Sequence, residues 1–86
     1  MPTISEFFGI QIMMFYDDHP PPHFHARYGE YEAFIQISPL GVLKGELPSR
    51  ALSLVIEWAH LHQQELIEVW NYAANNKKLH KIPPLQ

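Results

Sequence analysis

The sequence predicts an α+β fold, in which an antiparallel sheet of three or four strands precedes a long helix that packs on one face. Two observations support this class. Residues 9–47 alternate in polarity or are rich in β-branched and aromatic side chains, whereas residues 48–76 place polar side chains every three or four positions. The eight prolines fall where we expect elements to begin or end, since proline fixes φ and lacks an N–H.

Length and composition predict a single domain. The chain has 86 residues, of which 47% are hydrophobic and 17% charged, as is typical of a small folded protein. We expect one domain over residues 1–86, with a β-rich part at 9–47, a helical part at 48–76 and a basic, proline-containing tail at 77–86. The chain has no cysteine, which excludes disulfides and cysteine-based zinc sites.

The first strand is predicted over Gly9–Tyr16. Both of its faces are mainly apolar, which indicates a central strand that is covered on both sides. A stiff loop, Asp17–Pro22, follows it, because each of the three prolines holds φ at about −65° and pushes the preceding residue toward extended backbone.

A β-hairpin is predicted next, with strands His23–Tyr28 and Tyr31–Ser38 joined at Gly29–Glu30 by a type II′ turn, which favours glycine first. This register sorts the side chains by face. The core face carries Phe24, Ala26, Tyr28, Tyr31, Ala33, Ile35 and Ile37, and the other face carries His23, His25, Arg27, Glu32, Phe34 and Gln36. A short fourth strand is predicted over Val42–Leu47.

The helical part carries a polar stripe that is typical of one solvated helix face. It consists of Arg50, Ser53, Glu57, His60, Gln64, Glu68, Asn71 and Asn75. An unbroken helix over 48–76 would be about 40 Å long, whereas a domain of this size spans about 25–30 Å. We therefore expect the helix to protrude, to bend near His62–Gln64, or to pack against a second copy in a homodimer. In the tail, Ile82 and Leu85 are predicted to dock on the body or on a partner.

The proline loop and the first hairpin strand hold the side chains best suited to chemistry. On a strand, His23 and His25 project from the same face, about 6.5–7 Å apart along the chain. Arg27 continues this row, and the loop can bring Asp18 and His19 to its head.

One interpretation of this group is a site for a divalent metal such as Zn²⁺. The ligands would be His19, His23 and His25, with Asp17 or Asp18 as a further donor. Imidazole and carboxylate suit Zn, Ni, Fe and Mn, so several metals fit this set.

A second interpretation is a metal-independent ribonuclease, which needs no cofactor. Imidazoles titrate near neutrality, so His23 and His25 would exchange the roles of general acid and base. Asp18 and His19 would orient them, and Arg27 would hold the phosphate.

A third interpretation is a non-catalytic site for an anion or an acidic peptide, to which Asp17, Arg27, Glu32 and Gln36 would contribute as ligand-binding residues. The plain structural alternative is a solvated sheet face, on which Arg27 and Glu32 form a weak cross-strand ion pair.

Charge and hydropathy limit the partners. The formal net charge of −3 argues against a strongly cationic nucleic-acid binder. No apolar run approaches the ~20 residues needed to span a bilayer, and the first residues lack the pattern of a signal peptide. We therefore expect a cytoplasmic protein without membrane contact.

Several short motifs along the chain are similar to those of one protein family. They are Met1-Pro2-Thr3-Ile4, Phe8-Gly9-Ile10, Asp18-His19, Pro21–Ala26, Gly45–Pro48, Glu57-Trp58, Glu65-Leu66, Trp70 and Ile82–Leu85. By these motifs the chain resembles the prokaryotic family called domain of unknown function 4160 over almost its whole length. The resemblance implies a bacterial or archaeal protein that is often encoded beside another small protein, as in toxin–antitoxin pairs. The family's defining stretch coincides with the candidate site.

Together these features predict a toxin–antitoxin-type component whose histidine-rich hairpin binds RNA phosphate, cleaves RNA, or binds a partner protein encoded nearby. Two alternatives stay open. The first is a metal-binding protein that uses His19, His23 and His25. The second is a protein-interaction module in which the helical part and the tail bind a small cognate protein.

Overall fold

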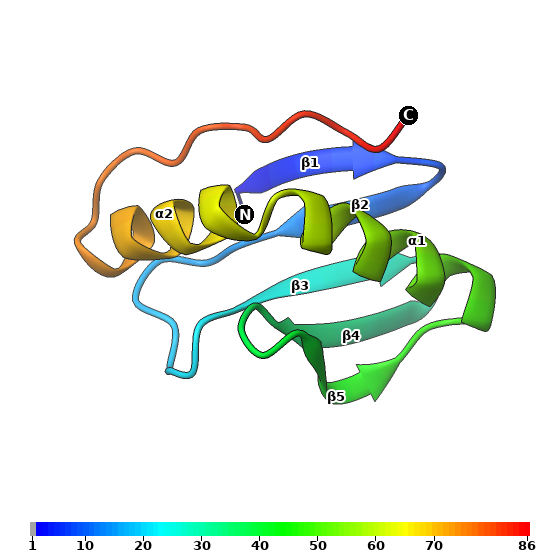
Figure 1. Ribbon diagram of the computed structural model, residues 1–86. Helices are drawn as coiled ribbons and strands as arrows, with labels where there is room; N and C mark the ends of the chain where they lie inside the picture. Colours follow the sequence, from blue (N-terminus) through cyan, green and yellow to red (C-terminus); the bar gives the residue numbers. More distant parts are fainter. Residues whose placement is uncertain (1) are drawn as a thin grey trace.

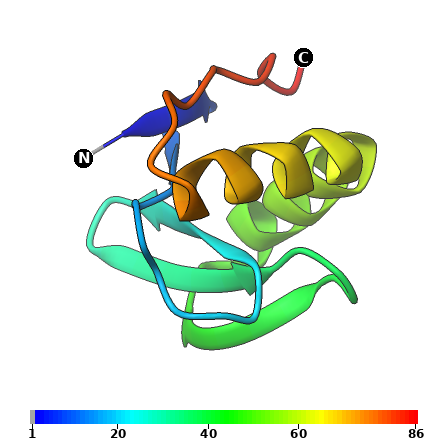
Figure 2. The same ribbon diagram turned by 90° about the vertical axis from the view of Figure 1, so that its left-hand side faces the viewer.

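One sheet and two helices make up residues 2–86, the part that the computed structural model describes (Figure 1). The elements are β1 (Thr3–Phe7), β2 (Ile10–Met13), β3 (His23–Tyr28), β4 (Tyr31–Gln36), β5 (Gly41–Glu46), α1 (Ser49–Leu61) and α2 (Gln63–Ala74). Each strand pairs antiparallel with the next, so the order across the sheet is β1-β2-β3-β4-β5. Both helices lie on one face of this sheet (Figure 2). The predicted α+β class is confirmed, but the numbers of strands and helices differ from the prediction.

The additional strand is β1, in a segment where the sequence pattern predicts none. A bulge between Thr3 and Ser5 interrupts its register with β2, so that the consecutive residues Ile4 and Ser5 are both buried. The bulge therefore removes the two-residue alternation by which a strand is recognised.

The turn to β2 is also unusual, because Phe8 and Gly9 both have positive φ (50° and 79°), as in a type I′ turn, where asparagine is the typical first residue.

The predicted first strand is confirmed as β2, although β2 is shorter than Gly9–Tyr16. It lies between β1 and β3, and Ile12 and Met13, which point to opposite faces, are both fully buried. Because both faces of β2 are covered by other parts of the protein, neither face is mainly polar.

The register of the β3–β4 hairpin is confirmed at all of its pairs, from His23 opposite Gln36 to Tyr28 opposite Tyr31. Gly29 has φ of 59°, as the first central residue of a type II′ turn requires. The prediction of a core position for both tyrosines is wrong, because they are partly exposed. They lie on the core face but at the tip of the hairpin, where they are the last pair before the turn.

The edge strand β5 begins one residue earlier than predicted and ends before Leu47. Gly45 in this strand has φ of 82°, and a Cβ there would collide with the backbone oxygen of Glu32. The backbone of β5 thus approaches β4 at a point that only glycine allows.

Of the three alternatives for the helical part, the structure shows the bend near His62–Gln64, because the helix is interrupted at His62 (φ −120°, ψ 26°). The His62 ring packs on Trp58 at 5.6 Å between centroids, and its Nδ1 pairs with Glu65 Oε1 at 2.6 Å. The interruption brings both helices within the 33 × 25 × 23 Å extents of the molecule. Neither helix in residues 2–86 is long and apolar enough to cross a bilayer.

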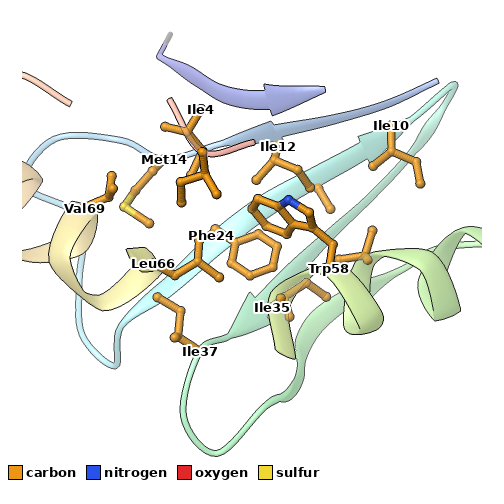
Figure 3. Close-up of a cluster of buried hydrophobic side chains, with 14 of the residues drawn as sticks. Ile4, Ile10, Ile12, Met14, Phe24, Ile35, Ile37, Trp58, Leu66 and Val69 are labelled. Carbon is orange, nitrogen blue, oxygen red and sulfur yellow. The ribbon is translucent and has the colours of Figure 1, made fainter. Parts of the chain in front are cut away.

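The core lies between the helices and the sheet, with Trp58 at its centre (Figure 3). The Trp58 ring contacts Phe7 and Phe24 at centroid distances of 5.4 and 5.7 Å. Its Nε1 donates to the Pro83 oxygen at 2.9 Å, and the Ile82 N–H donates to the Ile4 oxygen at 2.8 Å. These contacts hold the tail along β1 (Figure 1), so the predicted docking of Ile82 is confirmed.

Candidate metal centre

The candidate site lies at the start of β3, on the side of this strand opposite to Phe24 and Ala26. Phe24 and Ala26 belong to the core under the helices, so alternation sends His23 and His25 to the opposite face. The loop after β2 folds over these histidines. Its two ends are held by hydrogen bonds from the Asp17 N–H to the Ala73 oxygen (3.4 Å) and from the Ile37 N–H to the Pro22 oxygen (3.1 Å).

The loop directs one carboxylate at both imidazoles. Asp18 Oδ2 lies 3.2 Å from His23 Nε2 and 3.1 Å from His25 Nε2. The three side chains each offer one ligand atom, and these atoms all lie within 4.8 Å of one another. The other carboxylate oxygen, Asp18 Oδ1, accepts the backbone N–H of His19 at 2.9 Å. This bond orients the carboxylate and leaves Oδ2 for the histidines.

Each imidazole is also oriented from behind by an oxygen atom. His23 Nδ1 lies 2.8 Å from the Pro21 oxygen, and His25 Nδ1 lies 3.4 Å from Glu32 Oε2. A carbonyl oxygen and a carboxylate can only accept, so a hydrogen bond at Nδ1 requires a proton there. Asp18 Oδ2 is an acceptor too, so a neutral ring can donate to only one of its two oxygen partners. In the neutral tautomer with the proton on Nδ1, the lone pair sits on Nε2, which faces Asp18 Oδ2 in both residues.

Aromatic side chains enclose the two histidines. Centroid distances from the His25 ring are 4.5 Å to Phe15 and 4.2 Å to Phe34, and those from the His23 ring are 5.8 Å to Phe34 and 5.3 Å to Trp70. His23 and His25 are only 6% and 8% exposed. The interpretation of these two histidines as part of a solvated face is therefore wrong, because the loop and the aromatic rings exclude water from them.

The pKa of Asp18 is lowered by the histidines. Burial favours the protonated carboxyl and acts to raise the pKa. Hydrogen bonds from His25 and from the His19 backbone, together with the charges of His23 and His25, outweigh burial and bring the pKa below the ordinary value of aspartate. The site thus favours an ionised carboxylate.

Two of the predicted ligands do not join the group. The His19 side chain is exposed and only its backbone N–H reaches Asp18, so Asp18 takes the place predicted for His19 among the three ligands. Asp17 is exposed as well, with a left-handed φ of 56° that turns the chain toward the site. The next residue, Asp18, supplies the carboxylate that reaches the histidines.

The remaining predicted residues lie beside the group. Arg27 is largely exposed and lies 3.9 Å from Glu32, as expected for a weak cross-strand pair. Glu32 also touches His25, so it takes part in the site. Gln36 donates to the Ser38 oxygen at 3.2 Å.

Sequence reasoning misses the aromatic enclosure. Phe34 is the one apolar residue that the hairpin register places among the polar side chains, and this exception is the only signal for a covered site. Phe15 and Trp70 lie outside the hairpin, and the helical pattern around Trp70 is explained equally well by a core position.

A comparison with known families identifies this chain. No curated protein and no solved structure matches it. The model of one family, "Domain of unknown function (DUF4160)", matches residues 9–71. This span includes the loop, the hairpin, Trp70 and all the ligand atoms described above. Because the match covers well over half of the chain, the chain belongs to the DUF4160 family.

Proposed function

We propose that the protein binds one divalent transition-metal ion, of the class that imidazole prefers, through Asp18 Oδ2 and the Nε2 atoms of His23 and His25. The observation that carries this proposal is the convergence of the three atoms while both Nδ1 atoms face acceptor oxygens. In metal sites the distal nitrogen of a ligating histidine is almost always held in this way, since the bond selects the tautomer and the ring orientation.

Two of the three distances between the ligand atoms support a metal ion of the size of zinc, and all three atoms lie within 4.8 Å of one another. A tetrahedral zinc ion with bonds of about 2.0–2.1 Å separates its ligands by about 3.3–3.4 Å. The two distances from Asp18 Oδ2 to the imidazoles, 3.2 and 3.1 Å, are close to this separation. Two neutral imidazoles and one carboxylate would leave a fourth position for water or a substrate.

The charges favour an ion as well. When both rings are neutral with the proton on Nδ1, two lone pairs and one carboxylate oxygen face each other in a group that is mostly shielded from water. Such an arrangement needs a positive charge at its centre, which is either a metal ion or the extra protons of two imidazolium rings. The alternative to a metal is thus an ion pair of Asp18 with protonated histidines.

A titration with Zn²⁺ and with Co²⁺ tests the proposal, with the number of ions bound per chain read by calorimetry and by visible absorption. We expect one ion per chain, and we expect Asp18→Asn and His25→Gln to weaken binding at least about tenfold each. His19→Gln and His60→Gln are matched controls, because both side chains are exposed and lie outside the group. The proposal fails if the wild-type protein binds no ion, or if the controls lose binding as much as Asp18→Asn does.

A ribonuclease activity of the same residues is a second proposal, which a histidine paired with a carboxylate supports, since this is a general acid–base arrangement. It requires a phosphodiester to reach His23 and His25 past the aromatic rings, and it requires Arg27 to leave Glu32. Cleavage of RNA in excess chelator tests it. Equal cleavage by wild type and by a His23→Ala, His25→Ala double variant, or no cleavage at all, would remove it.

The wider role as a toxin–antitoxin component with a small partner protein remains a proposal that rests on the family resemblance. Copurification of a neighbouring gene product with the wild-type chain, and its persistence in Asp18→Asn, would favour an interaction surface separate from the histidines. Loss of the partner in that variant would place the histidine site within the interface.

A further inference from the structure

The turns of the β1–β2 and β3–β4 hairpins lie near the start of α1 (Figure 1). Residues of these three segments line a cavity that contains none of the histidines. It has a volume of about 210 Å³, which is below the ~300–1,000 Å³ typical of sites for drug-sized ligands. Its walls include Phe8, Ile10, Tyr28, Arg50, Ala51 and Leu54. The cavity is therefore mainly apolar and suits a small molecule.

Neither backbone preference nor burial accounts for Phe8 at the rim of this cavity. Phe8 occupies a left-handed φ of 50°, where a glycine or an asparagine fits better. Its side chain is 60% exposed, so the core is not the reason for an aromatic residue there. Tyr28, across the cavity, packs its ring over Gly9, at 3.4 Å from the position that a Cβ would take. The rings of Phe8 and Tyr28 thus both lie at the cavity, where each is partly exposed.

Arg50 is the only charged residue of the cavity wall. It is exposed, and it forms no ion pair with any residue between positions 2 and 86. A single guanidinium beside apolar and aromatic walls is complementary to a molecule with one anionic group and an apolar body.

We propose that this cavity binds a small organic monocarboxylate. The carboxylate would pair with the Arg50 guanidinium, and the apolar part would lie between Phe8, Tyr28 and Leu54. This site shares no residue with the metal centre, so the two proposals stand or fall separately.

A titration with 3-phenylpropionate tests the inference, with backbone amide NMR shifts of the ¹⁵N-labelled protein as the readout. 3-Phenylpropanol and 3-phenylpropylamine are the neutral and cationic probes of the same shape. We expect shifts confined to the cavity and an affinity for the acid about tenfold or more above that for the amine, because charge-assisted pairing favours the acid.

Two variants separate the roles of charge and apolar surface. Arg50→Gln should abolish the preference for the acid, whereas Arg27→Gln, a cation on the opposite sheet face, should leave it unchanged. Phe8→Asn should weaken binding of the acid and the alcohol alike, and asparagine suits its backbone conformation, so the fold should be retained. Shifts elsewhere in the protein, equal affinity for acid and amine, or an unchanged preference in Arg50→Gln would overturn the inference.

Discussion

Replacing Gly45 with alanine should destabilise the protein strongly, because β5 approaches β4 at this residue. The added Cβ would collide with the backbone oxygen of Glu32 and would lie 3.1 Å from the Cα of Ala33. Both contacts are with backbone, which cannot move without shifting the strand. Gly45 also has φ of 82°, which alanine adopts only at a cost.

The expected magnitude follows from these two effects. A left-handed conformation costs alanine about 1–2 kcal/mol, and separating the strands at this point removes one or two hydrogen bonds of about 1 kcal/mol each. The free energy of unfolding should therefore fall by about 2–4 kcal/mol, a large fraction of the ~5–15 kcal/mol typical of folded proteins. In a protein of this size this corresponds to a decrease in Tm of at least about 10 °C.

Urea denaturation followed by tryptophan fluorescence measures this change, since Trp58 is fully buried in the core. Gly41→Ala is the matched control in the same strand, because a Cβ there has no neighbour within 4 Å and its φ is not left-handed. Its free energy of unfolding should change by no more than about 0.5 kcal/mol. Equal effects of the two substitutions would refute the argument from φ and close approach.

Two further predictions concern the site. Since the folded state lowers the pKa of Asp18, its carboxylate contributes stability above the ordinary value of about 3.9, and this contribution is lost as pH falls through the lower folded pKa. Asp18→Asn should therefore reduce the dependence of urea midpoints on acidic pH, and an unchanged dependence would show that Asp18 is not responsible. Glu32→Gln should weaken Zn²⁺ binding about 10–100-fold by loosening His25. Arg27→Gln should not weaken Zn²⁺ binding. If Glu32→Gln and Arg27→Gln weaken it equally, the contact between Glu32 and His25 is not the cause of the loss.

Much of the fold could be predicted from short-range patterns. The hairpin register follows from alternation, because a slip of one residue would exchange the two faces and expose Phe24 and Ile35. Length predicts that an unbroken helix would exceed the size of the domain, but it does not decide between a bend, a protruding helix and packing against a second copy. The strand β1 could not be predicted, because its bulge depends on pairing with β2, which is not encoded in the local pattern of Thr3–Phe7.

The candidate site, like the fold, could be predicted only in part from the sequence. The spacing of His23 and His25 places both imidazoles on one face of a strand, whatever packs on them. Which carboxylate reaches them could not be predicted, because Asp17, Asp18 and His19 are adjacent and small changes of φ select among them. In the structure Asp17 has a left-handed φ, and the carboxylate that reaches the imidazoles is that of Asp18.

The sequence by itself determined the order of the elements from β2 onward, the pairing of the hairpin and the alignment of the two imidazoles, because these depend on periodicities of two and 3.6 residues within a few positions. Only the tertiary structure decided that the histidines are enclosed, that Asp18 Oδ2 faces both of them, and that Trp70 and Phe15 cover them. The physical reason is that burial and ligand geometry arise from contacts between distant segments. The loop, the sheet and α2 meet at this site only when the chain is folded.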